Sequence, residues 1–154
     1  MHVAARMEEL MEVGRILEFD AAHRLIDHEG KCKYLHGHRY KVALYVEAAE
    51  LDSVGRVIDF SVIKEKFGKW IDERLDHNTI LNQDDPLRKE ILAYCKPPGP
   101  YLMKGNPTAE LIAKELLWIA RELLKDSPVV ITRIVVFETP NCFVECGIEE
   151  APPL

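Results

Sequence analysis

Alternating apolar and polar positions predict β-strands near both ends of the chain. Residues 14–23 (GRILEFDAAH) and 38–48 (HRYKVALYVEA) place every second apolar side chain on one face, and the second segment does so more regularly. Residues 129–139 and 142–148 form two further apolar runs, separated by a Pro-Asn pair that is typical of a tight turn. Strands with one apolar face of this kind suit an antiparallel sheet.

Apolar positions at helical spacing predict two helices between the two pairs of strands. The first helix is expected within residues 57–75, with Asp59 or Ser61 as its N-cap. The second is expected to begin in the NPTAE segment, with either Asn106 or Thr108 as the N-cap. The apolar residues that form the two stripes are Val62, Ile63, Phe67, Trp70 and Ile71, and Leu111, Ile112, Leu116, Ile119 and Leu123.

The order strand, strand, helix, helix, strand, strand predicts an α+β fold, with a four-stranded antiparallel sheet and both helices on one face. We assign residues 14–154 to a single domain and residues 1–13 to an N-terminal extension. The extension lacks the apolar segment of a secretory signal, and no stretch approaches the roughly 18 apolar residues of a membrane span. Residues 82–105 contain four prolines and are expected to form a long loop.

Composition and charge indicate which kinds of molecule the protein binds. The chain is 47% hydrophobic and 30% charged, which is typical of a folded globular protein, and its formal net charge is -6. A net negative charge argues against nucleic acid as a partner but is compatible with a small anionic substrate bound by a local basic cluster. The four cysteines form no CxxC pair, which favours reduced thiols and a cytoplasmic location.

Three histidines are placed to converge on one side of the sheet. His36 and His38 lie two residues apart in a predicted strand and therefore point the same way, on the parity of the apolar face. His23 falls on the apolar parity of the first strand, so that a hairpin would bring all three imidazoles together. Three neutral imidazoles suit a zinc ion with an open fourth position, which is the arrangement of catalytic zinc sites. The sequence therefore predicts a zinc site formed by His23, His36 and His38.

Cys32 lies four residues before His36, in the loop that leads to the histidine pair. Its neighbours Lys31 and Lys33 and a nearby metal would favour the thiolate form. The sequence leaves three roles open for this thiol: a zinc ligand, a general base, or a loop cysteine without a chemical role.

Two acidic positions are further candidates. Asp76 and His77 follow the first helix, where a carboxylate beside an imidazole can tune proton transfer, although polar pairs are common at helix ends. Glu138 shares the parity of Val130 and Ile134 at the end of a β-branched strand. A carboxylate there either receives hydrogen bonds from a ligand with two adjacent N–H groups or is an exposed acid at a strand end.

Several motifs together resemble one known family. FDAAHRL, CKYLHGH, IDFS, LDHNTILN, NPTAE and the terminal FET occur in the order found in the 6-pyruvoyl-tetrahydropterin synthase and 6-carboxy-tetrahydropterin synthase family, which has the T-fold. The resemblance runs from about Gly14 to Gly147. It implies a zinc enzyme acting on a pterin, with subunits that assemble into a β-barrel, commonly a homohexamer of two trimers with active sites between subunits.

The resemblance also implies roles for individual residues. His23, His36 and His38 match the zinc ligands, and Cys32, Asp76 and His77 match the proton-transfer residues of the family. Glu138 matches the acid that anchors the pterin ring, and Thr108 and Glu110 match a motif near the substrate pocket.

The spacing of the cysteine separates the activities within the family. C-x-x-x-HGH, as found here, is similar to 6-carboxy-tetrahydropterin synthases of queuosine and deazapurine biosynthesis, which convert dihydroneopterin triphosphate and release acetaldehyde and triphosphate. The alternatives are a 6-pyruvoyl-tetrahydropterin synthase, which keeps the side-chain carbons, and a non-catalytic zinc-dependent pterin-binding protein. Residues 83–105 depart from the family pattern and are expected to be an insertion.

Overall fold

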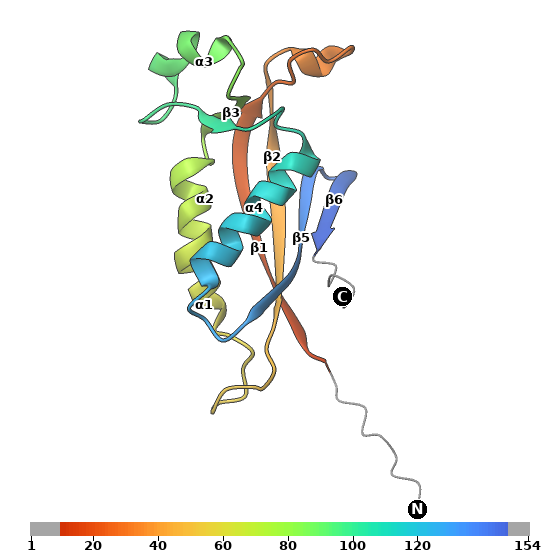
Figure 1. Cartoon of the computed structure of the whole chain (residues 1–154), viewed down its shortest axis with the longest axis vertical. Helices are drawn as coiled ribbons and strands as arrows, with labels where there is room; N and C mark the ends of the chain where they lie inside the picture. Colours follow the sequence, from red (N-terminus) through yellow and green to blue (C-terminus); the bar gives the residue numbers. More distant parts are fainter. Residues whose placement is uncertain (1–9, 148–154) are drawn as a thin grey trace, which may run out of the picture.

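A computed structural model describes residues 10–147 of the chain, and its centre is one curved sheet (Figure 1). Six strands follow the order β4-β3-β1-β2-β5-β6. The strands β1, β2, β5 and β6 are antiparallel neighbours, whereas β3 runs parallel to β1, and β4 runs parallel to β3. The bounds are Glu12–His23 for β1, His36–Glu47 for β2, Asn78–Asn82 for β3, Tyr101–Met103 for β4, Val130–Thr139 for β5 and Cys142–Gly147 for β6.

The prediction of a four-stranded antiparallel sheet is therefore wrong in strand number and in direction. The four predicted strands are present, and β3 and β4 extend the sheet on the side of β1. All five residues of β3 are buried, so the strand has no alternating pattern by which to recognise it. The strand β4 is only three residues long and lies in the proline-rich segment that was predicted to be a loop.

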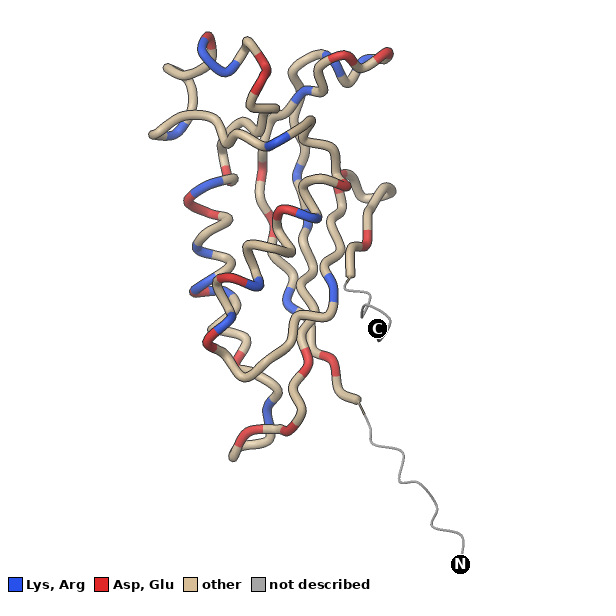
Figure 2. Tube along the Cα trace, viewed as in Figure 1, with Lys and Arg blue, Asp and Glu red and all other residues tan. Residues whose placement is uncertain are grey.

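The helices that follow β2 and β4 cover one face of the sheet, as predicted (Figure 1). The first predicted helix consists of α1 (Phe60–Ile63), a π-helical turn (Lys64–Gly68) and α2 (Lys69–Arg74). The second, α4, spans Ala109–Leu124, and a short helix α3 (Leu87–Glu90) lies in the 83–105 segment. Acidic and basic residues are interspersed along α2 and α4 (Figure 2), while their inner sides are apolar. No helix in residues 10–147 is long and apolar enough to span a membrane.

Two side chains cap the helices and settle the alternatives left by the sequence. Asp59 caps α1, because its Oδ1 accepts a hydrogen bond from the Ser61 backbone N–H at 2.9 Å. Thr108 caps α4, with its Oγ1 accepting from the Leu111 N–H at 3.2 Å. Asn106 has a different role: its side chain exchanges two hydrogen bonds with the backbone of Ile26, in the loop after β1. The start of α4 is thereby fixed to the end of β1, where His23 lies.

A β-bulge in β5 changes which residues share the face of Ile134. Tyr45 pairs with Arg133 and the next residue of β2 pairs with Ile131, so Thr132 is the extra residue of the bulge. The bulge reverses the side-chain parity, which is why Val130 is exposed and, contrary to the prediction, does not share the face of Ile134. The pairing of β5 with β6 has a second irregularity between Phe137 and Thr139, at Glu138 itself. Glu138 lies beside His23 and His38, on the helix-covered face, as predicted from Ile134.

Candidate metal centre and active site

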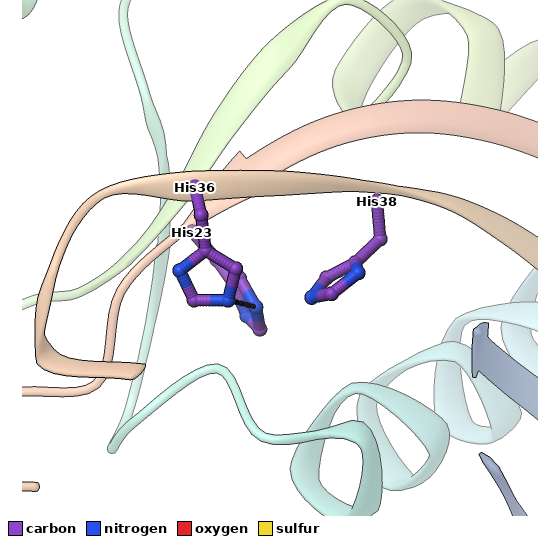
Figure 3. Close-up of side chains that lie close together, drawn as sticks. All are labelled: His23, His36 and His38. Carbon is purple, nitrogen blue, oxygen red and sulfur yellow. Dashed lines mark hydrogen bonds between the residues drawn. The ribbon is translucent and has the colours of Figure 1, made fainter. Parts of the chain in front are cut away.

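The pairing of β1 with β2 assembles the three predicted histidines. His23 lies directly opposite His36, and Ala21 lies opposite His38, so all three rings project from adjacent positions on the helix-covered face. Their centroids are 4.6 to 5.1 Å apart, and one nitrogen from each ring falls in a group whose members all lie within 4.8 Å of one another. In Figure 3 the rings point from the strand ends toward the loop that leads into α4. Within the described chain, this is the one cluster of side chains with the spacing of a metal site.

Backbone carbonyls fix the tautomers of two of these rings. The Nδ1 atom of His23 is 2.8 Å from the Pro107 carbonyl oxygen, and that of His36 is 2.7 Å from the Tyr34 carbonyl oxygen. A carbonyl oxygen only accepts hydrogen bonds, so each Nδ1 must carry the proton. In the neutral rings both Nε2 atoms then present lone pairs, and these two atoms are 3.1 Å apart.

Two facing lone pairs at this distance repel each other unless a cation lies between them. A tetrahedral zinc ion with Zn–N bonds of about 2.0–2.1 Å places its nitrogen ligands roughly 3.3 Å apart, close to the observed separation. Hydrogen bonds from the second ring nitrogen to carbonyl groups are also the usual outer partners of metal-binding histidines. The residues present therefore fit a zinc ion, for which His38 offers a third ligand atom.

The histidine cluster borders the hydrophobic core. His23 is 1% exposed, and the fully buried Tyr40 holds its hydroxyl 3.2 Å from the His23 Nδ1. Burial is the largest cause that lowers the pKa of His23 and of His38 below the ordinary value, and the neighbouring His36 lowers both further; Glu138 opposes the shift. Lowered pKa values keep these rings neutral at physiological pH, which is the form that binds a metal.

These pKa shifts predict how the stability of the metal-free protein depends on pH. Below the ordinary histidine pKa of about 6.5, the unfolded chain binds more protons than the native one, because the native pKa values of His23 and His38 are lower. The free energy of unfolding should thus be fully retained above pH 7 and fall as the pH drops from 6.5 toward 5. Urea unfolding of the protein in the presence of a chelator measures this slope, and a His23→Gln/His38→Gln variant should flatten it. A slope that is unchanged in the double variant would contradict the assignment.

Glu138 borders the histidine cluster. Its Oε1 lies 3.7 Å from the His23 Nε2 and 4.0 Å from the His38 Nε2, and its side chain is 28% exposed. Glu138, His38 and Lys41 also line an open depression of about 370 Å³ on the surface beside the end of β5. A carboxylate at the rim of such a depression is positioned to accept hydrogen bonds from a ligand that approaches the metal.

Cys32 lies in the short 3₁₀ turn Lys31–Lys33 that precedes β2, and its side chain is half-buried. Its backbone carbonyl accepts a hydrogen bond from the Leu25 N–H at 3.0 Å, which ties this turn to the end of β1. The sulfur does not belong to the group of mutually close ligand atoms formed by the three histidines. This arrangement favours a role other than metal ligand for Cys32.

Asp76 and His77 form a hydrogen-bonded pair outside the histidine cluster. The His77 Nδ1 is 2.7 Å from the Asp76 carboxylate, and the His77 ring is exposed. Both residues attach to Asp20 of β1: the Asp20 N–H donates to Asp76 at 2.9 Å, and the His77 N–H donates to the Asp20 carbonyl at 2.7 Å. The Asp20 side chain belongs to the sheet face opposite the helices. The His77 ring lines an open depression together with Asp20 and Arg39 on that face, whereas the three histidines project from the helix-covered face.

Thr108 and Glu110 lie at the start of α4. Thr108 uses its hydroxyl to cap α4, and Glu110 is exposed in the first turn of that helix. The adjacent Pro107 was not predicted as a site residue, although its carbonyl holds His23. Tyr34 and Tyr40 were also missed. Backbone carbonyls carry no sequence signal of their own, whereas the parity of Tyr40 with His38 placed it on the correct face.

Comparisons with known proteins agree with this geometry. The family model described as 6-pyruvoyl tetrahydropterin synthase matches residues 12–149. A protein of Rickettsia conorii named 6-carboxy-5,6,7,8-tetrahydropterin synthase is 44% identical over 137 residues, covering 88% of this chain and 99% of that protein. A protein of Haemophilus influenzae with the same name is 31% identical over 141 residues, covering 88% of this chain and 98% of that protein.

Solved structures share the fold. The crystal structure of an uncharacterized protein from Wolinella succinogenes superposes with a TM-score of 0.80 at 25% identity, over 92% of this chain and all of that one. The Caenorhabditis elegans 6-pyruvoyl tetrahydropterin synthase superposes with a TM-score of 0.68 at 21% identity, over 92% and 97% of the two chains. The match of the family model over most of the chain, together with the Rickettsia relative, establishes that the chain belongs to the 6-pyruvoyl tetrahydropterin synthase family.

Proposed function

We propose that this protein is a zinc-dependent 6-carboxy-5,6,7,8-tetrahydropterin synthase that acts on 7,8-dihydroneopterin triphosphate. The observation that carries the proposal is the 3.1 Å separation between the Nε2 atoms of His23 and His36. The chain belongs to a family in which its relatives bear this enzyme name. The reaction consumes one water and releases acetaldehyde and triphosphate. The first carbon of the three-carbon side chain stays on the ring as the carboxylate, and its oxidation balances reduction of the dihydropterin to the tetrahydropterin.

Side chains of this chain have distinct roles in the proposed reaction. His23, His36 and His38 would hold a zinc ion, which would supply a Lewis acid for the side-chain hydroxyls of the substrate. Glu138, at the edge of the metal centre, accepts hydrogen bonds from the amino-pyrimidinone edge of the pterin and so orients the side chain. Cys32 removes and returns protons along the side chain as a general base. His77, oriented by Asp76, exchanges the accompanying proton with the substrate.

The separation of the Asp76–His77 pair from the metal centre supports an assembled enzyme. The His77 ring lies beside Asp20 and Arg39 on the sheet face that the helices leave open, where Ile16 and Phe143 are also exposed. We propose that copies of the chain assemble through this sheet as a homohexamer of two trimers, and that the pair of one subunit serves the metal centre of another. Light scattering that gave a monomer with full activity would contradict this arrangement. The proposed enzyme works in the cytoplasm, in queuosine or related deazapurine biosynthesis.

A 6-pyruvoyl-tetrahydropterin synthase is the second candidate, since the family model and the Caenorhabditis structure carry that name. The two activities differ in whether a carbon–carbon bond breaks. Mass spectrometry of the products formed from dihydroneopterin triphosphate by the zinc-loaded protein separates them. Carboxy-tetrahydropterin with acetaldehyde supports the proposal; a pyruvoyl product with all side-chain carbons would replace it with the second candidate. Absence of turnover with zinc bound would contradict both and favour a pterin-binding protein.

Replacing Glu138 with glutamine tests the pterin anchor. An amide keeps the size of the side chain but no longer offers a negatively charged acceptor to two N–H groups. The loss of one charge-assisted hydrogen-bond pair should weaken pterin binding by about 2–3 kcal/mol, roughly 30- to 150-fold. Calorimetric titration with a pterin gives the affinity, and metal analysis gives the zinc content, which should not change. Unaltered affinity would contradict the anchor, and lost zinc would make Glu138 a metal ligand. Glu145→Gln, in the exposed part of β6, is the matched control.

A further inference from the structure

One turn of the 83–105 segment contacts the chain on both sides of His77, through backbone carbonyls before it and through the Asn78 side chain after it. The Lys96 Nζ donates to the carbonyl oxygens of Asp72 at 2.6 Å and of Asp76 at 2.9 Å. Gly99, three residues later, accepts a hydrogen bond at 3.1 Å from the Asn78 side chain. The Gly99 N–H also donates to the Lys96 carbonyl at 2.7 Å, which closes the turn formed by residues 96–99.

His77 needs such support because of its backbone conformation. Its φ angle is +54°, in the left-handed region that residues other than glycine rarely adopt. A strained backbone of this kind persists only where the surrounding contacts determine it. On one side, the His77 N–H is fixed to the Asp20 carbonyl of β1. On the other, the Asp76 carbonyl, which belongs to the Asp76–His77 peptide, is fixed by Lys96.

The position of Lys96 also suits the end of helix α2. The carbonyls of the last turn of a helix have no partner within the helix, and a lysine ammonium group is a favourable donor to them. Lys96 bridges such a carbonyl, that of Asp72, to the carbonyl of Asp76. Its ammonium group therefore connects the rigid helix to the strained peptide that carries the His77 ring.

From these contacts we infer that Lys96 is a positioning residue, and that the turn 96–99 holds His77 in its working conformation. The inference rests on the proposed function in so far as His77 transfers protons to the substrate. It gives the 83–105 segment a specific role, which is to supply a support for the Asp76–His77 pair. Lys96 contacts none of the residues proposed to bind the metal or the pterin ring.

Lys96→Met removes the ammonium group while keeping a long unbranched side chain. Lys96→Arg keeps a donor, and Lys96→Gln keeps a weaker, neutral donor as a second variant. Lys89→Met is the matched control, because Lys89 lies exposed in α3 of the same segment. The measurements are hydrogen exchange of the His77 amide, hydrogen exchange of a core amide such as that of Leu44, zinc content, and kcat and KM.

For Lys96→Met we expect about tenfold faster exchange at the His77 amide and about tenfold lower kcat, because a misplaced proton-transfer group slows the reaction. KM, zinc content and exchange at Leu44 should stay within twofold of the wild type. Lys96→Arg should restore most of the kcat, Lys96→Gln should fall between, and Lys89→Met should match the wild type.

Three results would overturn the inference. The first is unchanged exchange at His77 in Lys96→Met and Lys96→Gln. The second is equal acceleration at His77 and at Leu44, which would indicate general destabilisation. The third is a raised KM with unchanged kcat, which would place Lys96 in substrate binding. If the wild type itself shows no turnover, the proposed function fails, and the exchange at His77 relative to Leu44 alone decides whether Lys96 supports this turn.

Discussion

Replacing His38 with alanine is expected to remove the metal and, with it, the activity. Structural zinc sites with four ligands bind with about 10–16 kcal/mol, so one imidazole contributes roughly 3 kcal/mol, or two to three orders of magnitude in affinity. His38 is the histidine to change, because no backbone carbonyl within residues 10–147 accepts a hydrogen bond from it and its side chain is 20% exposed. Its removal should therefore leave the fold intact. Metal analysis after gel filtration and kcat/KM at limiting zinc measure the effect, and kcat/KM should fall by about a thousandfold.

His28→Ala is the control for this experiment. His28 lies in the loop after β1, where its Nδ1 accepts a hydrogen bond from the Gly30 N–H, and it is not part of the histidine cluster. This variant should retain zinc and turnover. Full zinc content in His38→Ala would show that the metal is held without His38, and the remaining pair, His23 and His36, would then need another partner. Retained turnover without zinc would contradict a role of the metal in the reaction.

The histidine cluster could be predicted because it depends on strand parity and on the pairing of two strands. His36 and His38 share a face in any regular strand, and His23 joins them once β1 and β2 pair as a hairpin. The same reasoning placed Glu138 on the face of Ile134, although another residue assigned to that face, Val130, proved to lie on the other face. The error at Val130 did not affect the prediction for Glu138, because this bulge lies between Val130 and Ile134, on the side away from Glu138.

The parts that could not be predicted depend on contacts between distant segments. The strand β3 is short, buried throughout and paired in parallel with β1, so no local pattern distinguishes it from a buried loop. The Pro107 carbonyl reaches His23 only because Asn106 fixes the start of α4 to the loop after β1. In the same way, the proximity of Asp76 and His77 in sequence suggested proton transfer, but not that they attach to the backbone of Asp20 in β1.

Replacing Cys32 with alanine should abolish turnover while leaving the zinc content unchanged. The sulfur does not lie within the group of histidine nitrogen atoms, so we expect no loss of metal ligands. The contact that orders its turn is made by the backbone carbonyl of Cys32 with Leu25, and a change of side chain preserves it. Removal of a general base typically costs a factor of 10²–10⁴ in rate, and kcat should fall by about this factor. Steady-state kinetics and metal analysis of the same preparation give both quantities.

Cys95→Ala is the matched control, because Cys95 is a half-buried cysteine in the 83–105 segment and is not part of the metal centre. It should behave as the wild type. Cys32→Ser refines the result: a hydroxyl group ionises far less readily than a thiol, so it should recover little activity if the thiolate is the base. Loss of zinc in Cys32→Ala would instead make the cysteine a metal ligand. Full turnover in Cys32→Ala would mean that the metal centre and the Asp76–His77 pair complete the proton transfers without it, and the assignment of the carboxy-forming reaction would then have to rest on the product alone.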